Sequence, residues 1–302
     1  MNDELSQSPI QDATPVGPIL AAAGARRRAA TASGHLQAIR TALDWVEDGG
    51  FRFPVRWVDR LARKPRPARQ LAGANPFLPW EPALEVGPAG PDHVILLNKY
   101  PVMDGHLLVI TRQFVPQEAP LDAGDVGAML PLLDEAGGLA FYNGGRIAGA
   151  SQPHRHLQWI PRDDVNRLPL LAAIEESVGD GLGACARLPF RHAIAAMPDG
   201  ALGQRPERIL RCYLALCERT GRLGPAGELR PYNLLMTTRA MLVVPRERES
   251  VEGISINSLG FAGSLFVPQP AMIDRIRQRG PLALLAAASG GLSGGSGPRR
   301  GK

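Results

Sequence analysis

Short runs of Val, Ile and Leu, each bounded by turn-forming residues, place the strongest constraint on the fold of this chain. Two such runs span residues 93–97 and 106–111, with Asn-Lys-Tyr-Pro at 98–101 and Asp-Gly at 104–105 between them. Aliphatic runs of this length favour strands, and the residues between them favour turns. The two segments are therefore expected to form neighbouring antiparallel strands.

Other segments extend this pattern to a mixed fold. Apolar residues at helical spacing in 123–137 predict a helix capped by Asp122, and Pro131 predicts a break or kink within it. Further segments are expected to be helical over 168–178 and 207–219, and extended over 232–237, 240–245 and 264–267. The expected class is α+β, with a mainly antiparallel sheet flanked by helices.

The two ends of the chain differ in composition from the segments between them. Residues 1–30 are rich in Ala, Pro and Ser without a sustained apolar period, and 289–302 are largely Gly and Ser. Both are expected to be flexible, as an N-terminal extension and a C-terminal tail. The apolar runs near the start are too short and too interrupted for a signal peptide or a membrane span, so a cytoplasmic protein with no membrane partner is expected.

The net charge of +5 admits a polyanionic partner, because clustered Lys and Arg attract phosphates. An arginine-rich, solvated surface explains the same charge without any function. Nucleic acid is not the expected partner, since only 5% of residues are aromatic and no stacking platform is evident. The three cysteines match no common zinc or redox spacing.

Two alternating histidines, in Ser-Gln-Pro-His-Arg-His-Leu-Gln from position 151, mark the candidate site. In a strand, residues two apart share a face, so His154, His156 and Gln158 would lie together. Leu157 and Trp159 would then face the core, which puts the imidazoles on the open side of the sheet.

This pattern suits catalysis by a histidine nucleophile. A neutral imidazole at His156 can attack phosphorus, and the ring of His154 or its carbonyl would fix the tautomer. Gln158 can donate to a non-bridging oxygen of the transition state. Small residues at 144–145 and 149–151 offer backbone N–H groups to phosphate.

A His-x-His pair also occurs in metal sites, so the spacing alone leaves that alternative open. A zinc site needs three or four protein ligands, and no further cluster of His, Cys or carboxylates lies nearby in the sequence. His93, His106 and His192 are distant candidates in apolar or basic surroundings, where ordinary hydrogen-bonded histidines are common. No metal ligand is assigned.

The segment from Gly149 to Gln158 closely resembles the active-site signature of the diadenosine tetraphosphate phosphorylases, also called ATP adenylyltransferases, of the histidine-triad superfamily. Four further blocks resemble that family in the same order along the chain. They are Asn75-Pro76-Phe77-Leu78-Pro79, Leu97-Asn98-Lys99-Tyr100-Pro101, Tyr232-Asn233-Leu234-Leu235 and Asn257-Ser258-Leu259-Gly260-Phe261-Ala262-Gly263.

The resemblance implies a histidine-triad-like fold and phosphorolysis of diadenosine tetraphosphate (Ap4A) to ATP and ADP through an AMP–histidine intermediate. His156 would be the nucleophile, and Gln158 would occupy the position where hydrolytic relatives have a third histidine. An amide cannot act as a general base for water, so transfer to phosphate is expected. The implied substrate-binding residues are Lys64, Asn98, Lys99, Asn143, Gly149, Ala150, Ser151, Gln152, Asn257, Ser258 and Leu259.

The resemblance also implies an organisation of the chain. Residues 31–200 would form the catalytic region, and 201–288 would complete the nucleotide site. No tightly bound cofactor is expected, and a divalent cation such as Mg²⁺ would come with the nucleotide. The chain departs from the family at Ser264 and Pro268, where a bulky and then a basic residue are common. One nucleotide contact and one phosphate contact are therefore in question.

Three other functions remain alternatives. A hydrolase of the same superfamily would release AMP without phosphate. A hexose-1-phosphate uridylyltransferase shares the His-x-His-x-Gln core, but the Gly-Ala-Ser-Gln lead-in at 149–152 and the lack of metal-binding cysteines argue against it. A basic nucleic-acid-binding or nucleotide-sensing module would need no catalysis.

Overall fold

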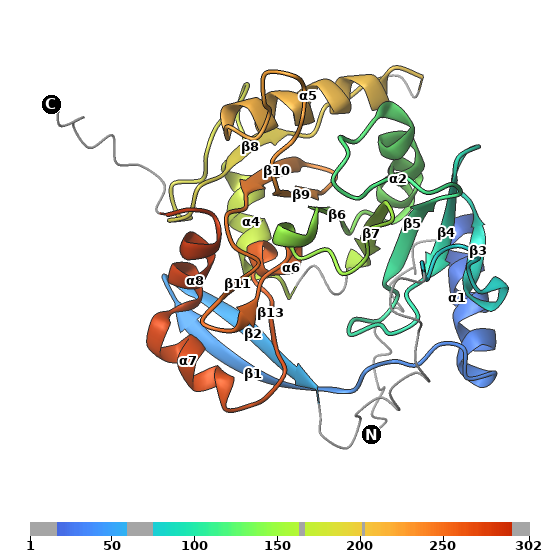
Figure 1. The fold of residues 1–302 in the computed structure, drawn as a ribbon, viewed down its shortest axis with the longest axis horizontal. Coiled ribbons are helices and arrows are strands. Elements are labelled where there is room, and N and C mark those ends of the chain that lie inside the picture. Colours follow the sequence, from blue (N-terminus) through green and yellow to red (C-terminus); the bar gives the residue numbers. More distant parts are fainter. Residues whose placement is uncertain (1–16, 59–74, 163–166, 201–202, 292–302) are drawn as a thin grey trace, which may run out of the picture.

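The computed structural model describes residues 17–58, 75–162, 167–200 and 203–291 (Figure 1). Its α-helices are α1 (Pro18–Ala32), α2 (Ala123–Ala136), α4 (Pro169–Glu176), α5 (Arg205–Arg219), α6 (Ser258–Ala262), α7 (Met272–Arg279) and α8 (Pro281–Ala288). Short 3-10 turns occur at η2 (Pro82–Leu84) and η3 (Arg146–Ala148). The strands are β1 (Thr41–Asp48), β2 (Phe51–Val58), β3 (Glu85–Pro88), β4 (His93–Leu97), β5 (Leu107–Thr111), β6 (Leu139–Gly144), β7 (His156–Ile160), β8 (Ala193–Ala196), β9 (Tyr232–Met236), β10 (Ala240–Pro245), β11 (Ser250–Val251), β12 (Ile254–Ser255) and β13 (Leu265–Val267).

An eight-stranded antiparallel sheet forms the centre of the molecule, in the order β3-β4-β5-β7-β6-β9-β10-β8. The predicted pairing of the strands at 93–97 and 106–111 is confirmed, with His93 opposite Thr111. β9 and β10 come from the predicted C-terminal region, and β9 pairs directly with β6. The two predicted regions therefore share one sheet.

Each face of this sheet is covered by a separate apolar core. On one face, α1, α2 and α5 pack over β4 to β10. On the other face, α4, α6 and α8 pack together with a smaller sheet, β1-β2-β13. Figure 1 shows the blue β1–β2 hairpin beside the red α7 and α8, so segments from opposite ends of the sequence meet there. β7, which carries the histidine motif, lies near the middle of the large sheet.

Helix α1 corrects the prediction that residues 1–30 are flexible throughout. Its part from Pro18 onward is an ordered helix alongside β3 and β4 (Figure 1). The carboxylate of Glu135 on α2 accepts hydrogen bonds from the first backbone N–H groups, those of Ile19 and Leu20, at 3.1 and 2.7 Å. A distant side chain thus caps a helix whose own sequence lacks an apolar period. Residues 1–16 lie outside the described residues.

The predicted C-terminal tail also begins too early. Ser289 is fully buried at the end of α8, and its hydroxyl accepts a hydrogen bond from the backbone N–H of Arg191 at 3.2 Å. The rest of the predicted tail from 292 onward lies outside the described residues.

Of the break or kink predicted at Pro131, helix α2 excludes the break, because it runs through that residue to Ala136. Pro131 lies on the exposed side of the helix, so the buried apolar face continues past it. The predicted cap is confirmed: Asp122 accepts from the backbone N–H of Asp125, which accepts from that of Asp122 in return.

Candidate active site

Strand β7 has the two faces that the alternation predicts. The rings of His154 and His156 both contact Phe77, with centroid separations of 5.6 and 5.4 Å. Leu157 and Trp159 lie in the core on the opposite face. The imidazoles are not on an open side of the sheet, however, because His154 is 0% and His156 4% exposed. The face of the strand that was expected to be open to solvent is almost completely buried.

The ring of His156 is held in the state that nucleophilic attack requires. Its Nδ1 lies 2.8 Å from the backbone carbonyl oxygen of His154. A carbonyl only accepts hydrogen bonds, so Nδ1 carries the proton and Nε2 keeps its lone pair. Nε2 has no hydrogen-bond partner within the described residues. Burial lowers the pKa of His156 to about 4, so the ring is neutral at pH 7.

The side chain of His154 is fully engaged by its neighbours. Nδ1 accepts from the amide of Asn75 at 2.8 Å, and Nε2 donates to the carbonyl oxygen of Thr111 at 2.8 Å. The rings of Phe77 and Phe114 pack against it edge-on. Of the two routes by which His154 was expected to fix the tautomer of the nucleophile, the structure uses the backbone carbonyl.

Gln158 is oriented by a hydrogen-bonded chain that starts at Asn98. The amide nitrogen of Asn98 donates to Nδ1 of His106 at 3.1 Å, so the proton of that ring lies on Nε2. This Nε2 donates to Oε1 of Gln158 at 3.0 Å. The carbonyl end of Gln158 is thereby occupied, and its amide N–H groups stay available to a ligand. Burial lowers the pKa of His106 to about 4.

A glutamine side chain fills the gap where β6 and β7 diverge. The paired register of these strands ends with Phe141 opposite Gln158. Beyond that point, Gln117 accepts from the backbone N–H of His156 at 2.8 Å and donates to the carbonyl oxygen of Asn143 at 2.9 Å. Gln117 is completely buried. It replaces the missing backbone hydrogen bonds and fixes the main chain of His156.

The backbone N–H groups of the loop before β7 differ in whether they already have a hydrogen-bond partner. The N–H groups of Gly149 and Ala150 already donate to carbonyl oxygens of Arg146 and Gly145, at 2.9 and 3.2 Å. The backbone N–H groups of Ser151 and Gln152 make no hydrogen bond within the described residues. Within the predicted loop from Gly149 to Gln152, these two are the backbone N–H groups that stay available to a phosphate.

Gly149 has a steric reason for its place in this loop. Its φ is +92°, and a Cβ there would lie 2.8 Å from the Cβ of Asn257. The loop thus packs directly against the segment that begins α6. This contact brings two of the family-like blocks together.

A buried polar network holds the contact between this loop and the start of α6 in place. Oδ1 of Asn143 accepts from Asn233 at 2.8 Å and from the backbone N–H of Ser258 at 2.9 Å. Nη1 of Arg246 donates to Oδ1 of Asn233 at 2.7 Å. Asn143 and Ser258 are 2% and 0% exposed. Their side chains belong to the supporting structure rather than to the open surface of the site.

A cavity of about 390 Å³ lies next to Gln158. Its lining combines predicted site residues with residues from β2, β12 and β13. They are Thr41, Arg56, Asn98, Val102, His106, Gln158, Ser255, Ile256, Asn257, Leu259, Gly260, Ser264, Leu265, Phe266, Val267 and Pro268.

Of the two predicted lysines, Lys99 is not part of this lining. Lys99 forms an ion pair with Glu81 on the protein surface. Lys64 lies outside the described residues.

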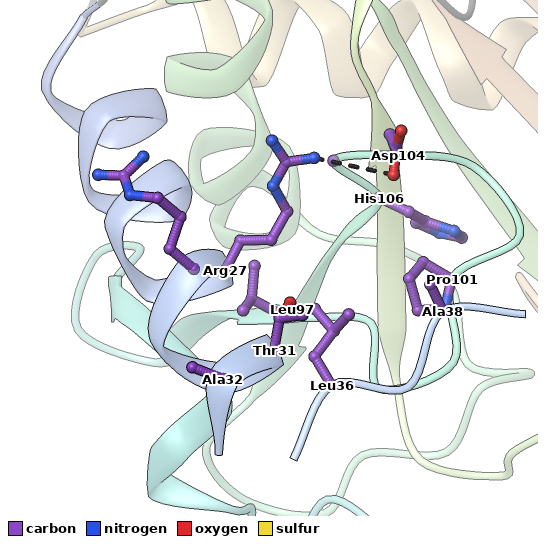
Figure 2. Close-up of a pocket in the computed structure, with 11 residues that line it drawn as sticks. Arg27, Thr31, Ala32, Leu36, Ala38, Leu97, Pro101, Asp104 and His106 are labelled. Carbon is purple, nitrogen blue, oxygen red and sulfur yellow. Dashed lines mark ion pairs between the residues drawn. The ribbon is translucent and has the colours of Figure 1, made fainter. Parts of the chain in front are cut away.

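A second cavity, of about 510 Å³, lies on the other side of His106. Figure 2 shows it between α1 and the turn that carries Pro101 and Asp104. Arg27 and Asp104 face each other across it, 3.8 Å apart. His106 therefore lines both cavities.

Neither a metal cluster nor a membrane-spanning helix is found in the part of the chain that the structure describes. No group of three or more His, Cys, Asp or Glu side chains there is arranged to hold a metal ion. No described helix is both long enough and apolar enough to cross a bilayer.

Comparison with protein families gives this geometry a context. The family model for the Ap4A phosphorylase N-terminal domain matches residues 11–176, and that for the ATP adenylyltransferase C-terminal domain matches 186–290. The chain belongs to the Ap4A phosphorylase family. The resemblance seen in the sequence is thereby confirmed.

Curated relatives in this family come from Saccharomyces cerevisiae. Protein APA1 is 26% identical over 275 residues, which cover 82% of this chain and 86% of the relative. Diadenosine 5',5'''-P1,P4-tetraphosphate phosphorylase 2 is 27% identical over 220 residues, which cover 62% of this chain and 66% of the relative.

Solved structures of the family share the fold. The crystal structure of yeast Ap4A phosphorylase Apa2 has a TM-score of 0.73 at 21% identity, over 91% of this chain and 98% of Apa2. Its complex with Ap4A gives 0.75 at 22% identity, over 90% of this chain and 97% of Apa2. The prediction of an α+β, histidine-triad-like fold is confirmed.

Two residues that shape the site, His106 and Gln117, were not predicted from the sequence. His106 was treated as an ordinary histidine, although it occupies the same face as Gln158. An antiparallel register between 106–111 and the motif strand would have shown this, since Leu108 lies opposite Gln158. Gln117 gives no sequence signal, because it lies in a loop and acts through its side chain alone.

Proposed function

We propose that this protein is an Ap4A phosphorylase, a nucleotidyltransferase that converts Ap4A and phosphate to ATP and ADP and, in the reverse direction, ATP and ADP to Ap4A and phosphate. The observation that carries the proposal is the state of His156. Its Nδ1–H is fixed on a carbonyl, its Nε2 is unpaired within the described residues, and its ring is neutral. Membership of the family supplies the substrate class.

The first chemical step forms a bond between Nε2 of His156 and the α-phosphorus of Ap4A. The bridging bond from that phosphorus to the β-phosphate oxygen breaks, and ATP leaves. In the second step an oxygen of inorganic phosphate attacks the same phosphorus, and the P–N bond breaks to give ADP. The imidazole returns to its starting state, so atoms and charges balance over the cycle.

Gln158 favours transfer over hydrolysis. Its carbonyl oxygen is occupied by His106, so the amide presents only N–H donors to the phosphoryl oxygens. Such donors stabilise the five-coordinate transition state but cannot take a proton from water. Phosphate, which is already an anion at pH 7, needs no base.

The decisive experiment follows products and the covalent intermediate together. Ap4A is incubated with the protein, with and without inorganic phosphate, and the products are separated. We expect ATP plus ADP only when phosphate is present, and an acid-labile, base-stable AMP adduct on His156 when it is absent. AMP released without phosphate would identify a hydrolase instead.

Two variants make this test specific to one histidine. His156→Ala should form no adduct, whereas His35→Ala, at an exposed histidine paired with Glu81, should form it normally. An adduct that persists in His156→Ala would disprove the assignment. Salt-sensitive RNA binding with no turnover would instead favour the nucleic-acid-binding alternative.

We place the enzyme in the cytoplasm, with Ap4A, ATP, ADP and phosphate as its small-molecule partners. A divalent cation such as Mg²⁺ would enter as the nucleotide complex rather than through a protein-held site. Titration of the adenylation rate with Mg²⁺ at fixed Ap4A tests this point.

A further inference from the structure

The described lining of the cavity beside Gln158 contains one positively charged side chain. Of its described lining residues, only Arg56 carries a formal charge at neutral pH, because His106 is kept neutral by burial. The remaining lining groups are amides, hydroxyls and apolar side chains. A substrate with several phosphate groups would be attracted to Arg56, the cation among the described residues on this side of the cavity.

Ser264 adds a second, independent sign of a ligand at the same wall. It is 1% exposed, and its Oγ makes no hydrogen bond within the described residues. A buried hydroxyl without a partner costs about 1–3 kcal/mol, so such groups normally meet a ligand or a water. This hydroxyl belongs to the cavity lining that also contains Arg56.

The strand pairing brings the two residues together. β2 and β13 run parallel, and Arg56 lies opposite Phe266, two residues after Ser264. β13 leads directly to Pro268, which lines the cavity but offers neither charge nor a backbone donor. The positive charge of this wall therefore comes from β2, and the hydroxyl comes from the start of β13.

We propose that Arg56 and Ser264 form a phosphate-binding subsite beside Gln158, which holds phosphate oxygens other than those of the α-phosphate. This inference rests on the proposed phosphorylase function. A guanidinium can pair with two oxygens of one phosphate at once, and the hydroxyl of Ser264 can donate to a third. The ligand is either the polyphosphate of the dinucleotide or the inorganic phosphate acceptor.

Two single-turnover measurements separate these sources. In the first, the AMP adduct is formed at increasing Ap4A concentrations without phosphate. In the second, the preformed adduct is discharged with increasing inorganic phosphate. For Arg56→Gln we expect the half-saturating concentration to rise roughly 10- to 100-fold in one of the two, with a smaller change in the maximal rate. The affected step identifies the ligand.

Matched variants test the geometry and guard against misfolding. Arg56→Lys should recover part of the loss, because it keeps the charge but not the paired donors. Ser264→Ala should raise the same constant by a few fold. Arg52→Gln should leave both constants unchanged, since Arg52 lies on the same strand but is exposed and stacks on Trp45.

The outcomes distinguish this inference from the proposed function. If the wild-type protein forms no adduct with Ap4A, the proposed function fails. If it forms the adduct, and Arg56→Gln and Arg56→Lys leave both half-saturating concentrations unchanged, the subsite alone is wrong. A loss in Arg56→Gln that Ser264→Ala shares in the same step supports the subsite.

Discussion

The segment from Arg155 to Gln158 carries polar side chains on both of its faces, but the protein uses them differently. On the site face, His156 and Gln158 are hydrogen-bonded at one end only, and the other end is left for a ligand. On the opposite face, Asp125 accepts from Nε2 of His93 at 2.9 Å and from Nη1 of Arg155 at 2.6 Å. Nη2 of Arg155 also donates to two backbone carbonyls of the loop before α2.

This difference shows how one short segment serves two purposes. A polar group whose partners are all internal contributes to the fold, and removing one partner leaves an uncompensated buried charge. A polar group that is held but incompletely paired costs some stability and is suited to bind substrate. Substitutions on the two faces should therefore separate activity from stability.

His156→Ala should give the largest effect on activity and little effect on the fold. Loss of a nucleophile reduces turnover by roughly 10⁵-fold or more in comparable enzymes. The midpoint of urea unfolding should stay the same or rise, because the variant no longer buries an incompletely paired ring. Retained phosphorolysis, or a strongly lowered unfolding midpoint, would contradict the comparison.

Arg155→Met should show the reverse behaviour. Breaking the buried pair with Asp125 should lower the free energy of unfolding by about 3–5 kcal/mol, as judged by urea denaturation. The folded fraction should still form the AMP adduct. As a control, Arg239→Met removes a largely exposed pair with Glu175 and should cost less than about 1 kcal/mol.

Gln158→Ala should lower kcat by roughly 100- to 1,000-fold while leaving stability nearly unchanged. His106→Leu should lower kcat by about 10-fold, because Gln158 loses the hydrogen bond that orients it. The double variant should be no slower than Gln158→Ala alone, since His106 acts through that amide. Additive losses would show that His106 acts independently on the reaction.

The smallest expected change in the reaction rate is its change with pH. Because burial holds the pKa of His156 near 4, the adenylation rate measured without phosphate should stay constant from pH 8 down to about 5.5. A limb centred near 6.5, the value for a free imidazole, would contradict a buried neutral nucleophile.

The stability of the fold, unlike the adenylation rate, should change with pH in this range. The imidazoles of His106 and His156 have a pKa of about 6.5 in the unfolded chain. In the folded protein, burial lowers the pKa of each to about 4. The free energy of unfolding therefore has its full value above about pH 6.5 and decreases as the pH falls towards 4. Each ring contributes a slope of up to about 1.4 kcal/mol per pH unit, and His156→Ala should make the decline shallower.

The sequence predicted those strands and helices that depend on apolar spacing and turn residues within the same short segment. The strands at 93–97 and 240–245 have the predicted bounds, and the alternation of β7 placed His156 and Gln158 on one face. Helix α1 escaped prediction because its first N–H groups are capped by Glu135, more than a hundred residues away. The sequence near α1 gives no sign of that partner.

The site residues also divide into those with local contacts, which were predicted, and those with distant contacts, which were not. The tautomer of His156 could be inferred from its neighbour two residues earlier, because that contact is local. The roles of His106 and Gln117 depend on which strands are adjacent and where they diverge, and a single sequence contains neither. The closed character of the site was also missed, since Phe77 and Phe114 come from loops outside the sheet.

The pairing of β6 with β9 has a consequence for the integrity of the chain. The boundary between the two family models falls after residue 176, yet the ladder from Ala140 opposite Met236 to Gly144 opposite Tyr232 crosses it. A polypeptide cut there would leave each half with an unpaired edge strand and half of an apolar core. Neither fragment would therefore fold as an independent domain that could be transferred to another protein. The two halves, produced together, would instead be natural partners for complementation as a split enzyme.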